Sequence, residues 1–266
     1  ECCMTRGRFQ LELTEITQDV ITLDGCLGAL TKSTALPAVF ALVMQIGNYL
    51  NYGTNQGACK GFTLDTLEKL NRVEGFNDKA YTLMRFIMET LESERKIREE
   101  ALEDLKLCDG ASKVEFEDAV RRLGELEKDV EKIAVAVKRP EDGAAGSSPL
   151  QDGKFEDAML KFVDDARKQL GEVRTQADKV QELAKVACDM FAEKPKTPAG
   201  EYLKKFAAFR KDMEEARRQN LLAKAKKEKA EKKRLEREAK EKALAAKKAA
   251  EEEKKKPPPK VDAADG

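Results

Sequence analysis

The 266-residue sequence contains no histidine and no tryptophan, and aromatic residues make up only 6% of it. Without histidine the chain forms neither a Ser-His-Asp triad nor a Cys-His pair, two common arrangements for nucleophilic catalysis. The cysteines include no C-x-x-C pair, so a zinc site would need ligands that lie far apart in the sequence. The sequence therefore predicts a protein that is not an enzyme and that has no catalytic residues, no metal and no cofactor.

Long apolar runs are missing as well. The longest, residues 35–44, is far short of the roughly 20 residues that cross a bilayer, which predicts no transmembrane segment. No targeting segment is visible, and the sequence starts in mid-pattern with glutamate, so we expect a fragment of a longer chain. Scattered cysteines without paired spacing are typical of a reduced intracellular protein.

Charge is abundant and unevenly spread. Lys and Arg number 50 and Asp and Glu number 50, yet residues 221–256 hold 15 Lys/Arg against 8 Glu. On charge alone this tail could contact nucleic acid or an anionic membrane, but it lacks interleaved aromatics and an apolar face that would make either contact specific. Two interpretations stay open: a solvated helix with a non-specific electrostatic role, and a true polyanion or filament contact. No specific nucleic-acid partner is predicted.

Apolar residues recur at helical spacing along most of the chain. In the longest pattern, eleven apolar positions between Phe155 and Phe191 advance by three or four residues each time, which indicates one stripe of one helix. Asp109 and Gly110 are expected to end a helix, and residues 138–153 are expected to form a loop. The predicted helices cover about residues 9–23, 34–52, 62–72, 79–107, 112–137 and 155–191, with a last one from about residue 201.

No internal repeat and no strand with period-two alternation is visible. The predicted fold is all-α, an elongated helical bundle followed by a long charged C-terminal helix and a disordered end. We expect one domain over residues 1–220, a Lys/Glu-rich helical tail over 221–256 that is frayed or free, and disorder over 257–266.

Residues 33–70, STALPAVFALVMQIGNYLNYGTNQGACKGFTLDTLEKL, closely resemble the signature of the formin homology-2 domain. That signature is a buried helix ending in G-N-Y-L-N, then a loop, then G-F-x-L-x-x-L-x-K-L. Downstream stretches such as KFEDAMLKFVDDARKQL and YLKKFAAFRKDMEEARRQN resemble the closing helices of the family more weakly. The resemblance covers roughly residues 1–220.

The resemblance implies an actin-binding protein of the cytoplasm and cytoskeleton. Formin homology-2 domains are antiparallel homodimers that encircle the barbed end of an actin filament, nucleate filaments and stay attached while subunits add. Each subunit has a lasso, a linker, a knob, a three-helix coiled coil and a post, and the lasso of one subunit wraps the post of the other. Profilin is implied only indirectly, through a proline-rich segment that is not present in these residues.

The chain resembles the coiled-coil end plus the post, without lasso, linker or most of the knob. The missing tryptophan fits this, since the family's lasso carries the tryptophans that enter the partner's post. We therefore expect that these residues alone do not nucleate filaments. The alternative is a protein of another class, a coiled-coil scaffold or a helical bundle that binds anionic membranes through its basic tail.

The resemblance also implies a lasso-binding site on the post. Gly47 and Gly53 carry no Cβ and would leave a hollow, Asn48 and Asn51 would hydrogen-bond foreign main chain, and the Tyr49 ring would form a wall. A simpler alternative is that Gly47 allows close helix packing and the two asparagines cap the helix end. The full set of expected lasso-binding residues is Gly47, Asn48, Tyr49, Leu50, Asn51, Gly53, Gly61 and Phe62.

One departure from the family pattern affects the expected actin contact. Family members usually continue after the final K-L to Thr-Lys-Ser, whose lysine is implicated in binding actin. Here the equivalent residues are 73–75, Val-Glu-Gly, so Glu74 replaces a positive charge by a negative one and puts that contact in doubt. Lys69, Arg72 and Lys79 are the remaining candidates for an actin contact.

Overall fold

The computed structural model describes residues 2–137, 153–195 and 197–254. In these ranges the chain forms eight α-helices and one 3₁₀ helix, and it forms no β-strand. The predicted all-α class is confirmed. The chain divides into two units, residues 1–216 and 217–266. Of the loop predicted over 138–153, residues 138–152 lie outside the described residues and residue 153 begins a helix, and the predicted disordered end at 257–266 lies outside them as well.

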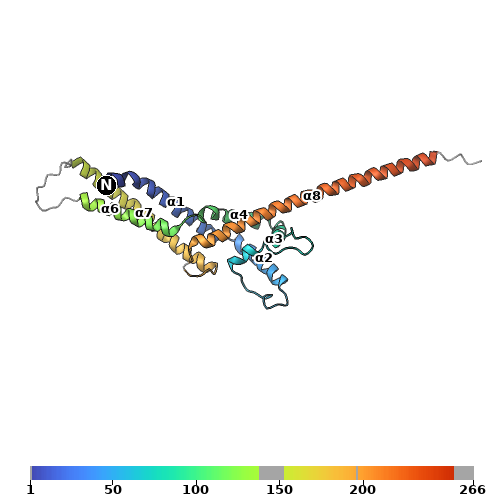
Figure 1. Ribbon diagram of the computed structural model, residues 1–266, viewed down its shortest axis with the longest axis horizontal. Coiled ribbons are helices and arrows are strands. Elements are labelled where there is room, and N and C mark those ends of the chain that lie inside the picture. Colours follow the sequence, from blue (N-terminus) through green and yellow to red (C-terminus); the bar gives the residue numbers. More distant parts are fainter. Residues whose placement is uncertain (1, 138–152, 196, 255–266) are drawn as a thin grey trace, which may run out of the picture. The chain divides into compact units, whose positions relative to one another are not determined.

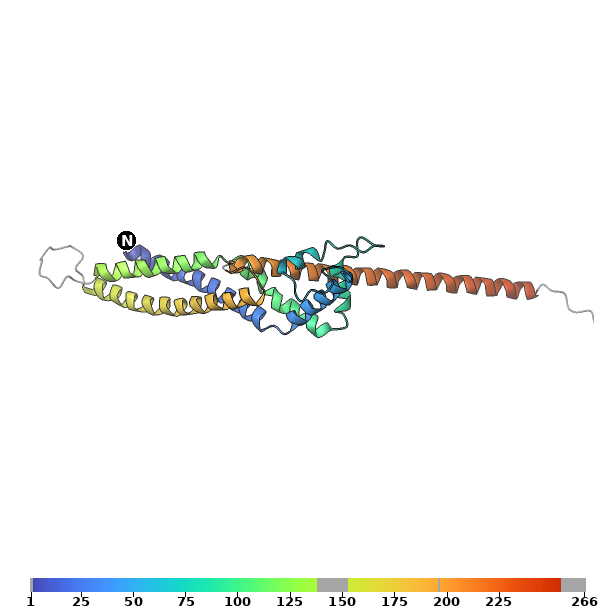
Figure 2. The same cartoon turned by 90° about the horizontal axis from the view of Figure 1, so that it is seen from below.

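Three helices of the first unit, α1 (Cys2–Lys32), α6 (Phe116–Val137) and α7 (Gly153–Met190), pack side by side (Figures 1 and 2). Most of the stripe expected on α7 is buried, for example Met159, Ala166 and Leu170. Where α7 meets α1, the rings of Phe9 and Phe162 are 5.3 Å apart in an edge-to-face contact. Apolar stripes of three helices therefore bury one another in a bundle.

Charged side chains join the outer edges of this bundle. Arg174 of α7 binds Glu127 of α6 through two hydrogen bonds of 3.0 and 2.6 Å, and Arg122 of α6 binds Glu15 of α1 at 2.6 Å. These partly exposed pairs add little stability, typically less than about 1 kcal/mol each. They instead favour one alignment of the helices over others.

Several predicted helix boundaries differ from those of the structure. α1 covers Cys2–Lys32 rather than residues 9–23, because its buried stripe continues through Leu23, Leu27 and Leu30. The helix expected to end at about residue 107 does end at Lys106, but Asp109 and Gly110 lie within the short helix α5 (Cys108–Ala111). There the carboxylate of Asp109 pairs with Arg210 of α8 (Ala199–Lys254). α6 accordingly starts at Phe116, four residues later than expected.

The helix predicted over residues 79–107 is two helices, α3 (Leu83–Thr90) and α4 (Arg95–Lys106). Between them the backbone makes short-range turns, such as the bond from the Glu94 amide to the Leu91 carbonyl at 3.2 Å. The turn lets the buried faces of both helices reach the core, and Arg98 of α4 pairs with Glu92 in the turn at 2.5 Å. Periodicity alone does not reveal such a corner, because both helices keep the same apolar spacing.

The remaining elements of the first unit gather around the C-terminal end of α1. They are α2 (Ala35–Leu50), the 3₁₀ helix η1 (Leu64–Lys69), α3, α4, α5 and the start of α8 (Ala199–Lys254). The expected helix over 34–52 corresponds closely to α2, and the Ser33 hydroxyl accepts a hydrogen bond from the Leu36 amide in its first turn at 3.0 Å. The helix expected over 62–72 is the shorter η1.

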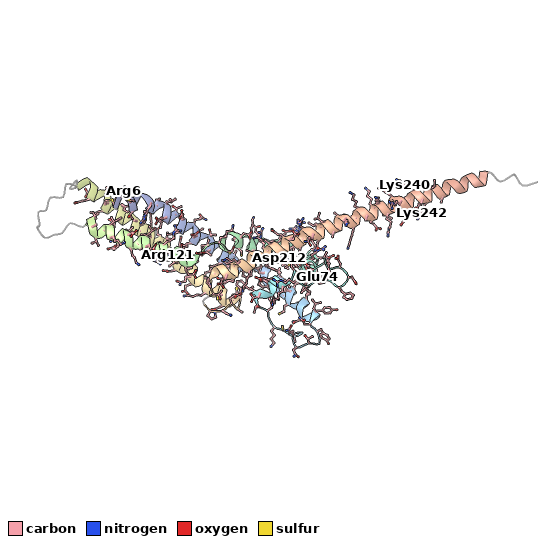
Figure 3. The ribbon with its side chains drawn as sticks, in the orientation of Figure 1. Arg6, Glu74, Arg121, Asp212, Lys240 and Lys242 are labelled. Atoms are coloured by element: carbon pink, nitrogen blue, oxygen red, sulfur yellow. The ribbon has the colours of Figure 1, made fainter. Side chains whose placement is uncertain are left out.

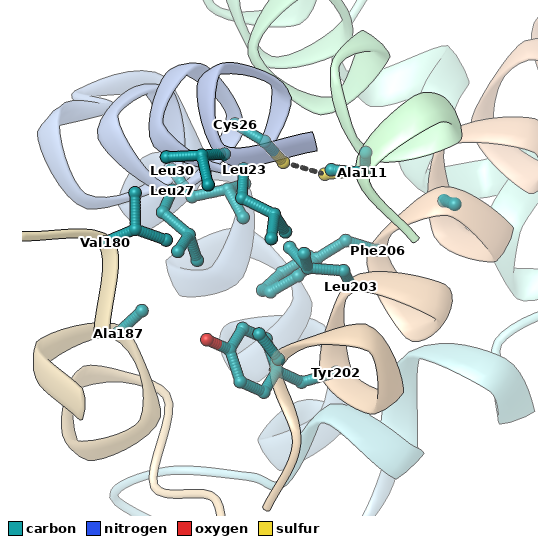
Figure 4. Close-up of a cluster of buried hydrophobic side chains, with 14 of the residues drawn as sticks. Leu23, Cys26, Leu27, Leu30, Ala111, Val180, Ala187, Tyr202, Leu203 and Phe206 are labelled. Carbon is teal, nitrogen blue, oxygen red and sulfur yellow. Dashed lines mark hydrogen bonds between the residues drawn. The ribbon is translucent and has the colours of Figure 1, made fainter. Parts of the chain in front are cut away.

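The core of this region joins helices that are distant in sequence (Figure 4). Leu23, Leu27 and Leu30 of α1 lie in one buried cluster with Tyr202, Leu203 and Phe206 of α8 and with Val180 and Ala187 of α7. The Cys26 thiol donates a hydrogen bond to the Cys108 sulfur at 3.5 Å within the same cluster. α8 therefore begins as a core helix.

The second unit continues α8 from residue 217, and its side chains from 224 to 245 are all exposed. Residues beyond 220 were expected to form a solvated helix, frayed or free, and in the structure α8 continues through them to Lys254. Among the described residues, no single helix is long and apolar enough to cross a bilayer; by length and composition alone, the pair α1 and α2 passes, with a bend of 57° between them.

Candidate functional site

The last turn of α2 presents large apolar side chains to solvent. Leu36, Val39 and Val43 of α2 are buried, but Tyr49 is 81% exposed and Leu50 is 57% exposed. Single exposed apolar side chains are ordinary on a protein surface, but clusters of them mark interaction sites. The segment predicted to bind a partner is therefore available at the surface.

Tyr49 and Leu50 border a hollow of about 480 Å³, which we call the Tyr49 hollow. One wall is the α2 face that carries Leu42, Ile46 and Tyr49. The other wall comes from residues 73–86, which are far from α2 in sequence. The lining residues are Leu42, Gln45, Ile46, Tyr49, Leu50, Val73, Glu74, Gly75, Tyr81, Thr82, Leu83 and Phe86.

The far wall is a hairpin-like loop that leads into α3. Glu74 and Thr82 form an isolated antiparallel bridge, and the Leu83 amide donates to the Val73 carbonyl at 2.8 Å. Within this loop Phe76 is fully exposed at 101%. Sequence reasoning missed Phe76 because the loop carries no apolar periodicity; the Gly-Phe-Asn-Asp turn composition was the only signal.

Tyr81 is fixed at the rim of the hollow by its neighbours. Its hydroxyl donates a hydrogen bond to the Glu89 carboxylate, and the Arg85 guanidinium lies 5.1 Å from the centre of its ring. Burial, followed by the contact with Glu89, raises the pKa of Tyr81 to about 12. At neutral pH the rim therefore presents a neutral phenol held in one orientation.

The amides of Asn48 and Asn51 are engaged inside the chain. Asn48 donates through Nδ2 to the Cys59 carbonyl at 2.9 Å and accepts through Oδ1 from the Cys59 amide at 3.0 Å. Asn51 donates through Nδ2 to the Gly47 carbonyl at 2.9 Å. Asn48 thus holds the following loop against α2. Asn51 binds a carbonyl at the end of α2, which is the contact expected if this asparagine caps the helix.

The glycines of this segment differ in what they permit. Gly53 has a φ of 81°, a backbone conformation that residues other than glycine rarely adopt. A Cβ at Gly57 would lie 2.4 Å from the Asn51 carbonyl oxygen, so the loop needs glycine there too, a position the sequence did not single out. A Cβ at Gly47 would meet nothing within 4 Å, and Gly47 is absent from the lining of the Tyr49 hollow.

Gly61 and Phe62 lie at a second hollow, of about 310 Å³, which we call the Phe62 hollow. It uses Pro37, Ala41 and Met44 of α2, which are on the face opposite to Leu42 and Ile46 because of the helical spacing. The Phe62 ring packs edge-to-face on Phe40 at 5.8 Å. The lining residues are Pro37, Phe40, Ala41, Met44, Lys60, Gly61, Phe62, Leu64, Met190, Phe191 and Ala192. Four of the eight predicted residues therefore line two separate hollows, and Gly47, Asn48, Asn51 and Gly53 line neither of them.

The basic residues expected to contact actin are all exposed. Lys69 ends η1, Arg72 follows it, and Lys79 lies in the loop before α3. Glu74, which is labelled in Figure 3, is exposed as well. It also lines the Tyr49 hollow. The negative charge of Glu74 is thus part of the candidate site.

Ion pairs connect η1 to α8. Lys205 of α8 binds Asp65 at 2.8 Å and Glu193 at 2.8 Å. The hydrogen bond from Lys205 is the largest influence on Asp65 and lowers the pKa of its carboxyl. These contacts help to fix η1, which supplies Leu64 to the Phe62 hollow.

Within the described ranges, no group of three or more His, Cys, Asp or Glu side chains is placed to hold a metal ion. A further hollow of about 640 Å³ is lined by residues of α6, α7 and the segment that leads into α8, among them Phe116, Gln181 and Pro198. It includes none of the residues predicted to bind a partner. The two hollows on α2 therefore remain the candidate site.

Residues 1–214 match the family model described as Formin Homology 2 Domain. The chain is 27% identical over 251 residues to human protein diaphanous homolog 3, which covers 89% of this chain and 20% of that protein. It is 28% identical over 240 residues to formin-like protein 14 of Arabidopsis thaliana (88% and 18%). It is 26% identical over 192 residues to protein cappuccino of Drosophila melanogaster (68% and 18%). The chain thus spans about a fifth of the length of these relatives.

Proposed function

Because the chain belongs to the Formin Homology 2 Domain family, we propose that it is an actin-binding module that acts in filament assembly. The observation that carries the proposal is the exposed end of α2, where the family signature G-N-Y-L-N borders an apolar hollow. In this proposal the protein works without catalysis, at actin filaments of the cytoplasm.

We further propose that the end of α2 is the post of a dimeric ring that nucleates filaments and stays at their barbed ends. The Tyr49 hollow and the Phe62 hollow would take apolar side chains from the lasso of a second subunit. Volumes of about 480 and 310 Å³ are ample for single aromatic side chains. The 266 residues contain no tryptophan, so the tryptophans of the family's lasso would come from a segment outside them.

The roles of the signature residues follow from their contacts. Tyr49 and Leu50 have exposed apolar surface that a partner would cover. The Asn48 amide already pairs with Cys59 on both sides, so in this proposal it shapes the loop and does not bind foreign main chain. Gly47 is open to solvent on its Cα side, which leaves room for a partner to approach the backbone closely.

We propose that Lys69, Arg72 and Lys79 supply the positive charge of the actin contact. All three are exposed and lie on the segment between η1 and α3. Glu74 lies on the same segment and would weaken attraction to an acidic surface by its opposite charge. Replacing Glu74 by lysine should therefore strengthen binding to actin.

Assembly of pyrene-labelled actin tests the proposal with two proteins, the present chain and a longer domain that also carries a lasso. We expect the longer protein to accelerate assembly and the present chain to leave it unchanged. No acceleration by the longer protein would contradict the actin function. Strong acceleration by the present chain alone would contradict the proposal that nucleation needs a lasso from outside these residues, but it would support the actin function.

A further inference from the structure

The exposed part of α8 carries its excess positive charge on one face. Seven positions spaced by three or four residues form a single line along the helix. We call this line the basic stripe, and it consists of Leu222, Lys226, Lys229, Lys233, Arg237, Lys240 and Leu244. Five successive cations therefore lie between two leucines, with no carboxylate among them.

The five glutamates of residues 221–245 all lie outside the stripe, and two of them pair with Arg234. Arg234 binds Glu231 at 2.7 Å and lies 3.6 Å from Glu238. Within the described part of the chain, none of the ion pairs involves a residue of the basic stripe. Figure 3 labels one cation inside the stripe, Lys240, and one outside it, Lys242. Both are exposed.

This distribution differs from that of a helix whose charges only keep it in solution. Such a helix gains stability from a carboxylate three or four residues from each lysine, and it loses stability where like charges take those positions. Lys226 and Lys229 have no carboxylate three or four residues away in either direction. Lys233, Arg237 and Lys240 each have one glutamate at that spacing. The first part of the stripe therefore accepts repulsion along the helix that a binding surface of opposite charge would relieve.

We propose that the basic stripe binds a bilayer surface rich in anionic phospholipid. A straight helix presents the stripe as a row about 33 Å long, which suits a plane. Leu222 and Leu244, at the two ends of the stripe, are 59% and 57% exposed. Both lie on the same face of the helix as the cations and can enter the interface between headgroups and acyl chains. Four of the five cations are lysines, which act as point charges and suit a diffuse field of headgroups.

The composition disfavours nucleic acid as the occupant. Residues 221–245 contain no aromatic side chain to stack on bases, and the stripe has a single arginine for bidentate contacts to phosphate. The proposal is independent of the actin site, because it uses none of the residues around α2.

Vesicle co-sedimentation of the full chain tests the proposal. The stripe variant is Lys226→Gln, Lys229→Gln, Lys233→Gln, and the matched control is Lys224→Gln, Lys227→Gln, Lys232→Gln. Both remove three positive charges, and glutamine has nearly the helix propensity of lysine, so circular dichroism should show equal helix content. With vesicles of phosphatidylserine and phosphatidylcholine, we expect each stripe lysine to contribute about fivefold, so the stripe variant should bind ~100-fold more weakly.

The control should lose much less affinity, and binding of the unchanged chain should fall as salt is raised. An equal loss in both variants would show that net charge alone acts and would overturn the stripe. Absence of binding to anionic vesicles would overturn the proposal. The proposal would also be overturned if the chain bound duplex DNA or actin filaments more tightly than the vesicles and if the stripe variant weakened that binding to the same extent.

Discussion

Substituting Gly47 separates the folding of α2 from its proposed contact with a second subunit. Gly47 lies in the last turn of α2, and a Cβ there would meet nothing within 4 Å. Replacing glycine in a helix by alanine or leucine lowers the entropy lost on folding, which is worth up to about 1 kcal/mol. For a domain of this size that gain corresponds to a rise of about 2–4 °C in unfolding temperature. The rise should be smaller here, because Gly47 lies near the end of α2 and not in its interior.

The same substitution should damage the dimer of a longer domain that carries a lasso. If a partner approaches the backbone at Gly47, the side chain of Gly47→Leu would overfill the contact at a cost of about 1–3 kcal/mol. That cost weakens association by ~5- to 150-fold. Thermal unfolding by circular dichroism on the present chain and sedimentation equilibrium on the longer domain measure the two effects.

Gly171 provides the matched control. It lies within α7, and a Cβ there would also meet nothing within 4 Å. Gly171→Leu should therefore raise the unfolding temperature without changing association. If Gly47→Leu dimerises as tightly as the unsubstituted domain, no partner covers Gly47 and the reasoning fails. A lower unfolding temperature for Gly47→Leu would instead show that the glycine is needed for packing within the chain.

Three further substitutions test contacts around the two hollows. In an absorbance titration, Glu89→Gln should lower the pKa of Tyr81 from about 12, although burial keeps it above the ordinary value of 10; an unchanged titration would exclude Glu89 as a cause. Asn48→Ala removes both hydrogen bonds of the side-chain amide, so backbone amides of the following loop should exchange hydrogen faster, while equal exchange rates would show that these bonds do not hold the loop. The lowered pKa of Asp65 means that its pair with Lys205 stabilises the fold fully above pH 3.8 and loses this effect as pH falls through the lowered value. Lys205→Met should therefore destabilise the protein in urea more at pH 7 than at pH 3, and an equal loss at both would contradict the ion pair.

Much of the fold could be predicted because it depends on local periodicity. The stripe from Phe155 to Phe191 indicated α7, and the apolar run before Gly47 indicated α2 with a change in environment at its end. These features are legible in sequence because a helix that buries one face must repeat apolar residues every three or four positions. The exposed tail could be predicted for the same reason, since it has almost nothing large and apolar to bury.

Contacts between distant segments were decided by the tertiary structure alone. Phe86 and the loop containing Phe76 follow Tyr49 by more than twenty residues, and only folding makes Phe86 a wall of the same hollow. The corner between α3 and α4 is also non-local, because the core contacts on both sides determine it. The sequence thus determined which face of α2 is buried and where that burial ends. Only packing decided which segments surround the end of α2, because apolar periodicity indicates that a residue is buried but not which residues it contacts.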